Sequence, residues 1–176
     1  MTALPDDWYP GQIPANVALG EHSYLYSSIS FLHHRSRRRP SVRMAGDSGV
    51  YDDSFFELGP EGEVQIGRYC SISGTFFVTD GRVTIGDHTF IGYGTVLADR
   101  PHAVPPGSRA RLGSRDEAPG GITIGDNVWI GTRVIILGET QVGSDAVIGA
   151  GAVLDGETIP AGAIVAGNPA RTVGRV

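Results

Sequence analysis

Residues 122–154 read ITIGDNVWIGTRVIILGETQVGSDAVIGAGAVL, and a large apolar residue recurs in this stretch at every sixth position. The series is Ile124, Ile130, Ile136, Val142, Ile148 and Leu154, and glycine directly follows four of its six members. A period of six differs from the alternation of a half-buried strand and from the 3.6-residue period of an α-helix. It is the repeat length of a parallel β-helix, in which short strands joined by tight corners form each coil. The stretch therefore predicts an all-β solenoid.

The same spacing extends less regularly toward the N-terminus. Stacked coils of this kind bury one continuous apolar column and pair their backbones in parallel ladders. About six coils can be counted in the chain, more than the three or so that such repeats need for stability. The core residues predicted for the earlier coils are Ile13, Leu19 and Leu25; Met44, Val50 and Phe56; Ile66, Ile72 and Val78; and Ile85, Ile91 and Leu97.

Residues 1–176 are expected to form a single domain, because this length suits one hydrophobic core. Residues 1–12 are expected to be an irregular lead-in, and residues 159–176 a C-terminal tail. Residues 31–41 and 99–121 break the period and are predicted to be excursion loops; the first contains HHRSRRRP, and the second contains four prolines and four arginines. A loop as long as the second is usually functional or disordered.

The composition excludes several classes of protein. A formal net charge of -5 argues against general nucleic-acid binding, which needs a basic face. No apolar run approaches the length of a membrane span, and the N-terminus lacks the pattern of a signal peptide, so we expect a soluble, cytoplasmic protein. The single cysteine, Cys70, cannot form an internal disulfide, and we expect it to be a small buried residue rather than a nucleophile.

Four segments carry a resemblance to a known family: IGYGTVLADRPH at 91–102, ITIGDNVWIG at 122–131, VIGAGAVL at 147–154 and AGNPAR at 166–171. In this order, on a six-residue repeat, they resemble the hexapeptide-repeat acyltransferases, and more closely the galactoside/maltose and xenobiotic acetyltransferase branches. The resemblance implies a left-handed parallel β-helix, since spacing alone does not define handedness. It also implies direct transfer of an acetyl group from acetyl-CoA, as co-substrate, to a hydroxyl of a small-molecule acceptor.

The resemblance places the general base at His102, at the start of the long loop. Imidazole titrates near neutral pH and can take the proton of the attacking hydroxyl, which contributes on the order of 100- to 10,000-fold to the rate. The alternative is that His102 is an exposed loop histidine without a catalytic role.

The resemblance further implies a homotrimer that binds acetyl-CoA in grooves between its subunits. Gly131, Thr132, Ala150 and Gly151 match positions where small residues let the extended cofactor arm approach the backbone. Trp129 resembles a residue that walls the reaction pocket. It can equally be an aromatic residue at a subunit contact.

Three charged residues complete the candidate site. Arg171 and Arg175 are candidate contacts of a CoA phosphate, which arginine binds bidentately, although arginines near a chain end are often only solvated. Asp80 matches a carboxylate that contacts the acceptor sugar in the galactoside branch, or is simply a corner residue of the TDGR turn. Cys70 and Ile72 stand where that branch has Tyr and Asn, so the acceptor stays undefined.

Other functions are also compatible with the repeat. One is N-acetylation of an amino sugar or another amine, and another is a non-catalytic scaffold. The γ-class carbonic anhydrases share this fold and bind a metal through three histidines, but the histidines of this chain do not follow that pattern, so no metal is expected. The basic run at 35–39 either reaches an anionic acceptor, meets an acidic rim of a neighbouring subunit, or is a solvated loop.

Overall fold

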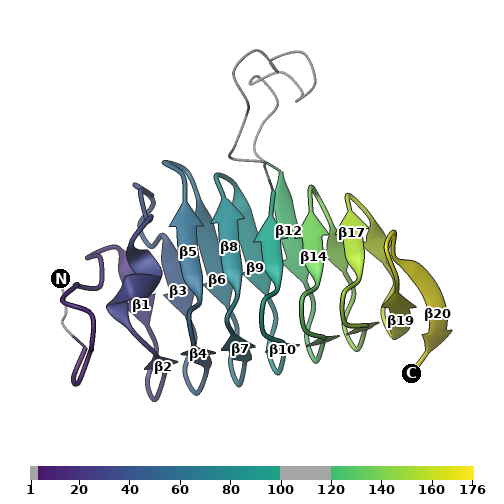
Figure 1. Ribbon diagram of the computed structural model, residues 1–176, viewed down its shortest axis with the longest axis horizontal. Helices are drawn as coiled ribbons and strands as arrows, with labels where there is room; N and C mark the ends of the chain where they lie inside the picture. The colour runs from purple at the N-terminus through teal and green to yellow at the C-terminus, as the bar shows by residue number, and fades with distance from the viewer. Residues whose placement is uncertain (1–3, 100–119) are drawn as a thin grey trace, which may run out of the picture.

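A computed structural model describes residues 4–99 and 120–176 of the chain. In these residues, short strands stack side by side into three sheets that run along a solenoid, with the N-terminal coil at one end and the C-terminal coil at the other (Figure 1). Each full coil contributes one strand to each sheet, so the coil is a triangle with three corners. The described chain is therefore an all-β parallel solenoid, as predicted.

The three sheets are defined by their strands. The first sheet contains β1 (Val17–Leu19), β3 (Val42–Met44), β6 (Glu63–Ile66), β9 (Arg82–Ile85), β12 (Gly121–Ile124), β15 (Gln141–Val142) and β18 (Thr158–Ile159). The second contains β2 (Tyr24–Leu25), β4 (Gly49–Tyr51), β7 (Ser71–Ser73), β10 (Phe90–Ile91), β13 (Trp129–Ile130), β16 (Val147–Ile148), β19 (Ala163–Ala166) and β20 (Arg171–Arg175). The third contains β5 (Phe55–Leu58), β8 (Phe76–Thr79), β11 (Val96–Ala98), β14 (Ile135–Leu137) and β17 (Val153–Asp155).

The winding of the coils is left-handed. In Figure 1, β5, β8 and β14 run upward on the near side, β6 and β9 follow on the far side, and the chain advances from left to right. Neighbouring strands within a sheet belong to successive coils and pair in parallel, as β8 does with β11 and β9 with β12. The left-handed sense that the resemblance implied is the sense of this solenoid.

The core contains the column of residues that the six-residue period predicts. All six members of the series from Ile124 to Leu154 are at most 3% exposed. Two predictions in the earlier coils are wrong. Leu19 is in register with Met44 but is 37% exposed, because β1 is the edge strand of the first sheet and has a neighbouring strand on one side only. Val78 is only half-buried, since Phe77 points inward and pairs with Phe56 and Leu97.

The corner between the first and second sheets explains the Gly-Asp pairs of the repeat. Asp87 accepts a hydrogen bond from the backbone N–H of Arg68 (2.7 Å), and Asp126 accepts one from the N–H of Asp87 (2.7 Å). Each carboxylate thus satisfies a corner N–H of the preceding coil. Gly86 precedes Asp87, and a Cβ atom there would lie 2.6 Å from the carbonyl carbon of Gly125, so only glycine fits between the coils.

Residues 31–41 leave the regular coil but pack tightly on it. The segment follows a single 3-10 turn, η1 (Ser28–Phe31), whose last residue stacks on Phe56 with ring centroids 5.2 Å apart. Ser36 is buried and donates a hydrogen bond to the carbonyl of Gly62 (2.6 Å).

The C-terminal residues continue the solenoid before the chain reverses. Strand β18 pairs in parallel with β15, and β19 with β16, so the expected tail at 159–176 still holds strands of the coil. The chain then turns back at 167–170, and β20 pairs antiparallel to β19. This hairpin places Arg171 and Arg175 along the end of the second sheet (Figure 1).

Candidate functional site

Four predicted cofactor residues lie together at the corner between the second and third sheets. The N–H of Gly131 donates to the carbonyl of Ile148 (2.8 Å), and the N–H of Gly151 donates to the carbonyl of Thr132 (2.9 Å). A Cβ atom on Gly131 would lie 2.6 Å from the backbone nitrogen of Ala150, so the two coils approach closely only because this residue is glycine. Thr132, Ala150 and Gly151 are exposed, so the four residues form a track of small side chains at this corner, beside the exposed Arg133.

Trp129 lies on the second sheet, next to this corner. Its side chain faces residues of the opposite corner, between the first and second sheets. Its indole is 48% exposed and stacks on Phe90, with ring centroids 6.3 Å apart. It lines an open hollow of about 590 Å³, together with residues of three successive coils and the C-terminal residue: Asn127, Asp145, Val147, Ala161, Gly162 and Val176. None of the four corner residues lines this hollow. The hollow beside Trp129 thus lies toward the corner between the first and second sheets, whereas the track of small residues lies at the corner between the second and third.

Arg171 and Arg175 are both exposed on β20. Arg171 donates to the carbonyl of Ala170 (2.6 Å) and lies 3.9 Å from a carboxylate oxygen of Glu157. Arg175 donates to the carbonyl of Ala161 (3.0 Å), a residue that lines the hollow beside Trp129. An exposed ion pair of this length contributes little stability. Each guanidinium has five N–H groups, so both retain donors for an anion.

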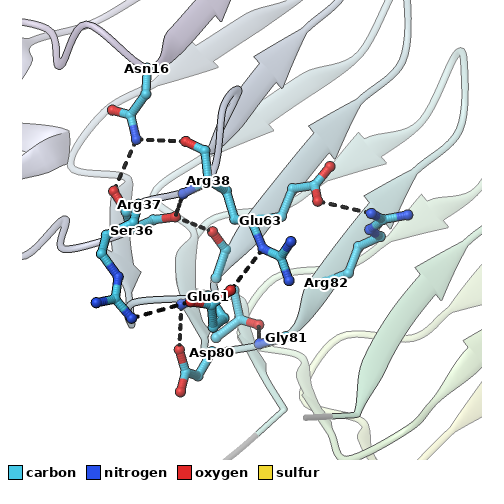
Figure 2. A network of polar contacts seen from close by, with 11 residues as sticks. Asn16, Ser36, Arg37, Arg38, Glu61, Glu63, Asp80, Gly81 and Arg82 are labelled. Atoms are coloured by element: carbon cyan, nitrogen blue, oxygen red, sulfur yellow. Dashed lines mark hydrogen bonds and ion pairs between the residues drawn. The ribbon is translucent and has the colours of Figure 1, made fainter. Parts of the chain in front are cut away.

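Asp80 lies at a different corner, between the third and first sheets. Its Oδ1 accepts a hydrogen bond from the backbone N–H of Glu61 (2.9 Å) and closes the turn between β5 and β6 (Figure 2). A Cβ atom on Gly59 would lie 2.5 Å from the same oxygen, so a side chain at position 59 would displace this carboxylate. Asp80 therefore has a structural role at its corner.

Asp99 is a residue that the period did not identify. Its buried carboxylate accepts hydrogen bonds from the hydroxyl of Thr79 and from the backbone N–H groups of Gly81 (2.8 Å) and Asp80 (3.3 Å). It is the last described residue before the long loop and joins the root of that loop to the turn that holds Asp80. His102 itself lies outside the described residues.

The single cysteine is a small buried residue, as the sequence predicts. Cys70 is 3% exposed, and its Sγ lies 3.1 Å from the carbonyl oxygen of Gly86. Burial raises the pKa of this thiol. A nucleophilic cysteine needs a lowered pKa and access to solvent, and Cys70 has neither.

The histidines and acidic residues do not assemble a metal site in residues 4–99 and 120–176, where no group of three or more potential ligands converges. His88 instead stacks on Tyr69, with ring centroids 4.9 Å apart. Within the same ranges, no helix has the length and apolar character needed to cross a lipid bilayer.

A model of a known protein family matches part of the repeat. Residues 121–156 match the family model described as "Bacterial transferase hexapeptide (six repeats)", and these residues contain the track of small side chains. Residues 121–156 therefore carry a hexapeptide repeat of the bacterial transferase type. The stacked coils and their inward apolar column agree with this assignment.

Solved structures resemble this solenoid over 90% of the chain. A hexapeptide-repeat-containing acetyltransferase of Vibrio cholerae O1 biovar eltor, complexed with acetyl coenzyme A, is 21% identical over 90% of this chain and 70% of its own, with a TM-score of 0.56. AntD, an N-acyltransferase from Bacillus cereus complexed with dTDP and coenzyme A, is 17% identical over 90% and 82%, with a TM-score of 0.66. A maltose O-acetyltransferase from Clostridium difficile 630 is 22% identical over 90% and 69%, with a TM-score of 0.53. At these identities the likeness concerns the fold.

Proposed function

We propose that this hexapeptide-repeat protein is an acyl-CoA-dependent acyltransferase that moves an acetyl group from acetyl-CoA to a hydroxyl of a small-molecule acceptor. The observation that carries the proposal is the match of residues 121–156 to a bacterial transferase model, over coils that form the track of small residues at Gly131 and Ala150. Neighbouring structures with the same fold were solved with acetyl coenzyme A or coenzyme A, which supports acyl-CoA as the donor.

In the proposed mechanism, His102 takes the proton of the acceptor hydroxyl as its oxygen attacks the thioester carbonyl. The same imidazolium then returns the proton to the departing thiolate, so the products are the acetyl ester and free CoA. No covalent intermediate on the protein is required, in agreement with the burial of Cys70. The track at Thr132 and Gly151 would hold the extended pantetheine arm, and Arg171 and Arg175 would bind its phosphates.

We further propose that three copies of the chain assemble in the cytoplasm, with each site shared between two copies. The track of small residues and the carboxylates of Asp80 and Asp99 lie at different corners of one copy, with the third sheet between them. The outward face of that sheet supports this arrangement, because it carries an apolar ladder that a second copy would bury: Phe55, Phe76, Val96, Ile135 and Val153.

A thiol-release assay tests the proposed function. The purified protein is incubated with acetyl-CoA and a panel of hydroxyl acceptors, and free CoA is measured by reaction of its thiol. We expect release that depends on both the protein and an acceptor. If no acceptor gives CoA and calorimetry detects no acyl-CoA binding, the chain is a non-catalytic scaffold and the proposal is wrong.

N-acylation is the second candidate. The N-acyltransferase from Bacillus cereus superposes with a TM-score of 0.66, above the 0.53 of the maltose O-acetyltransferase. The two reactions differ in the stability of their products, since mild base cleaves an ester and leaves an amide intact. An acetylated product that survives mild base would favour an amine acceptor over a hydroxyl acceptor.

A further inference from the structure

The run at 35–39 reverses the charge of the protein locally. The chain has 14 arginines and no lysine, and its net charge is -5. Four of the arginines fall within this run of five residues: Arg35, Arg37, Arg38 and Arg39. We call these five residues the arginine segment. Arginine presents a rigid, planar set of donors that matches the oxygens of a carboxylate, sulfate or phosphate.

The backbone of the arginine segment is fixed by hydrogen bonds from every side. The N–H groups of Arg35 and Arg37 donate to the carbonyls of Leu58 and Pro60, both at 2.9 Å. The amide of Asn16 donates to the carbonyls of Ser36 and Arg38, again at 2.9 Å (Figure 2). The buried Ser36 points inward, so the backbone of the segment is held in place while its arginine side chains are exposed.

Acidic partners offset only part of this charge. Arg37 and Arg38 converge on one carboxylate, that of Glu61, with N–O distances of 3.3 and 3.1 Å (Figure 2). Arg35 and Arg39 are exposed and make no ion pair within residues 4–99 and 120–176. The segment therefore keeps a net positive charge of two or more, carried by side chains that reach solvent.

The arginine segment borders Asp80, the predicted acceptor residue. It runs along the corner between the third and first sheets, where Asp80 and Asp99 also lie. Glu61 connects the two groups directly, since its side chain binds Arg37 and Arg38 while its N–H donates to Asp80 (2.9 Å). The chain also enters the loop that contains His102 from this corner.

We propose that the arginine segment binds an oxyanion, namely a carboxylate, sulfate or phosphate, carried by the acyl acceptor. This inference rests on the proposed acyl transfer and names the chemical class of its substrate. Charge-assisted hydrogen bonds to arginine are about twice as strong as neutral ones. A backbone that is already ordered reduces the entropic cost of binding. The remaining polar part of the acceptor then lies toward Asp80.

Binding measurements without acetyl-CoA test this inference separately from the acyl transfer. Two matched pairs serve as probes: galacturonate with galactose, and a heparin tetrasaccharide with maltotetraose. We expect titration by nuclear magnetic resonance or calorimetry to detect the anionic member of at least one pair and neither neutral sugar. A preference for galacturonate indicates a small acidic acceptor, and a preference for the heparin fragment indicates an acidic polymer. Equal binding of neutral and anionic probes, or binding of none, overturns the inference.

Arginine variants locate the binding surface. Arg35→Gln combined with Arg39→Gln should weaken anion binding about tenfold or more, the loss expected when charge-assisted hydrogen bonds are removed. Arg68→Gln is the control, since Arg68 is exposed and pairs with Asp47 (2.9 Å) at another corner. It removes one positive charge, as Arg35→Gln or Arg39→Gln does alone, without touching the segment. If Arg68→Gln weakens binding as much as either single change in the segment, the effect is general charge and the inference is wrong.

The two proposals can fail independently. Anion binding that depends on Arg35 and Arg39, in a protein that releases no CoA with any acceptor, would remove the acyl transfer and keep the oxyanion site. Acetylation of neutral acceptors, unaffected by the arginine changes, would keep the acyl transfer and remove the oxyanion site.

Discussion

The carboxylate of Asp7 fastens the lead-in segment to the first coil. It accepts hydrogen bonds from the hydroxyl of Ser27 (2.7 Å) and from the N–H groups of Ser28 (2.9 Å) and Tyr9 (3.1 Å). Desolvation opposes ionisation, but these hydrogen bonds outweigh it and lower the pKa of Asp7 from 3.8 to about 2. The ionised carboxylate is thus favoured in the folded state, and its contribution is lost when the group is protonated.

This predicts an acid-sensitive contribution to stability. The contribution of Asp7 is complete above its unfolded pKa of 3.8 and declines as the pH falls toward its folded pKa of about 2. Urea unfolding across this range should show a steeper loss of unfolding free energy in the wild type than in Asp7→Asn. Asp6→Asn is the control, because Asp6 is exposed. Parallel curves for the wild type and Asp7→Asn would contradict the prediction.

The second prediction at the scale of single residues concerns the proposed catalytic role of His102. Removing the general base should lower kcat on the order of 100- to 10,000-fold. The affinity for acetyl-CoA should stay nearly unchanged, since the proposed cofactor contacts lie on the coils. Steady-state kinetics and calorimetry of His102→Ala measure the two quantities separately. Comparable turnover in the variant and the wild type would remove His102 from the mechanism.

At the scale of the coil, glycine sets how closely one corner can approach the same corner of the next coil. Gly131→Ala would place a Cβ atom 2.6 Å from the backbone nitrogen of Ala150, and backbone atoms cannot swing away as a side chain does. We expect the variant to lose about 1–3 kcal/mol of unfolding free energy, as in other overpacked sites. Chemical denaturation monitored by circular dichroism measures this loss.

Gly174→Ala is the matched control for this change. The nearest atom to its added Cβ would be the Cδ1 of Ile164 at 3.6 Å, an ordinary contact. We expect Gly174→Ala to be neutral or slightly stabilising, because alanine reduces the entropy of the unfolded chain. If both variants lose the same stability, close approach at the corner is not the cause.

At the scale of the whole molecule, the outward faces of the sheets predict where subunits meet. The outward face of the first sheet is polar, with Gln65, Thr84 and Thr123 in one ladder, whereas the outward face of the third sheet carries Phe76 and Ile135. We expect light scattering at micromolar concentration to give three times the chain mass of 18.6 kDa. Ile135→Arg should lower this mass, and Thr123→Arg should not. A monomeric wild type would end the model of a site shared between copies.

The sequence predicted the regular part of this molecule because burial alone sets its period. All six members of the series from Ile124 to Leu154 are buried as that rule predicts, but the inward residues between them, such as Val128 and Val134, were not part of the series. Val78 did not, because a local change of phase brings Phe77 onto the core column between Phe56 and Leu97. Leu19 did not, because periodicity does not show where a stack ends.

The site was less predictable for a different reason. The carboxylate of Asp99 meets groups 18 to 20 residues earlier in the chain, and Asn16 meets the carbonyl of Arg38 22 residues later. Such contacts depend on which turns of successive coils share a corner, and a repeat period carries no information on the polar side chains there. The small residues of the track were predicted from the family resemblance of segments 122–131 and 147–154, not from the period alone.

The corner between the third and first sheets has a consequence for how such proteins diversify. The chain leaves the coil at this corner after β11 and resumes at β12, and Gly121 to Ile124 still pair in register with Arg82 to Ile85. The arginine segment leaves from the same corner after η1, and β3 resumes in register with β1. Insertions at this one corner change length and charge without altering a single rung of the ladders. Under the proposed function, a loop transplanted to this corner from another solenoid should change which acceptor is acetylated and leave the coils intact.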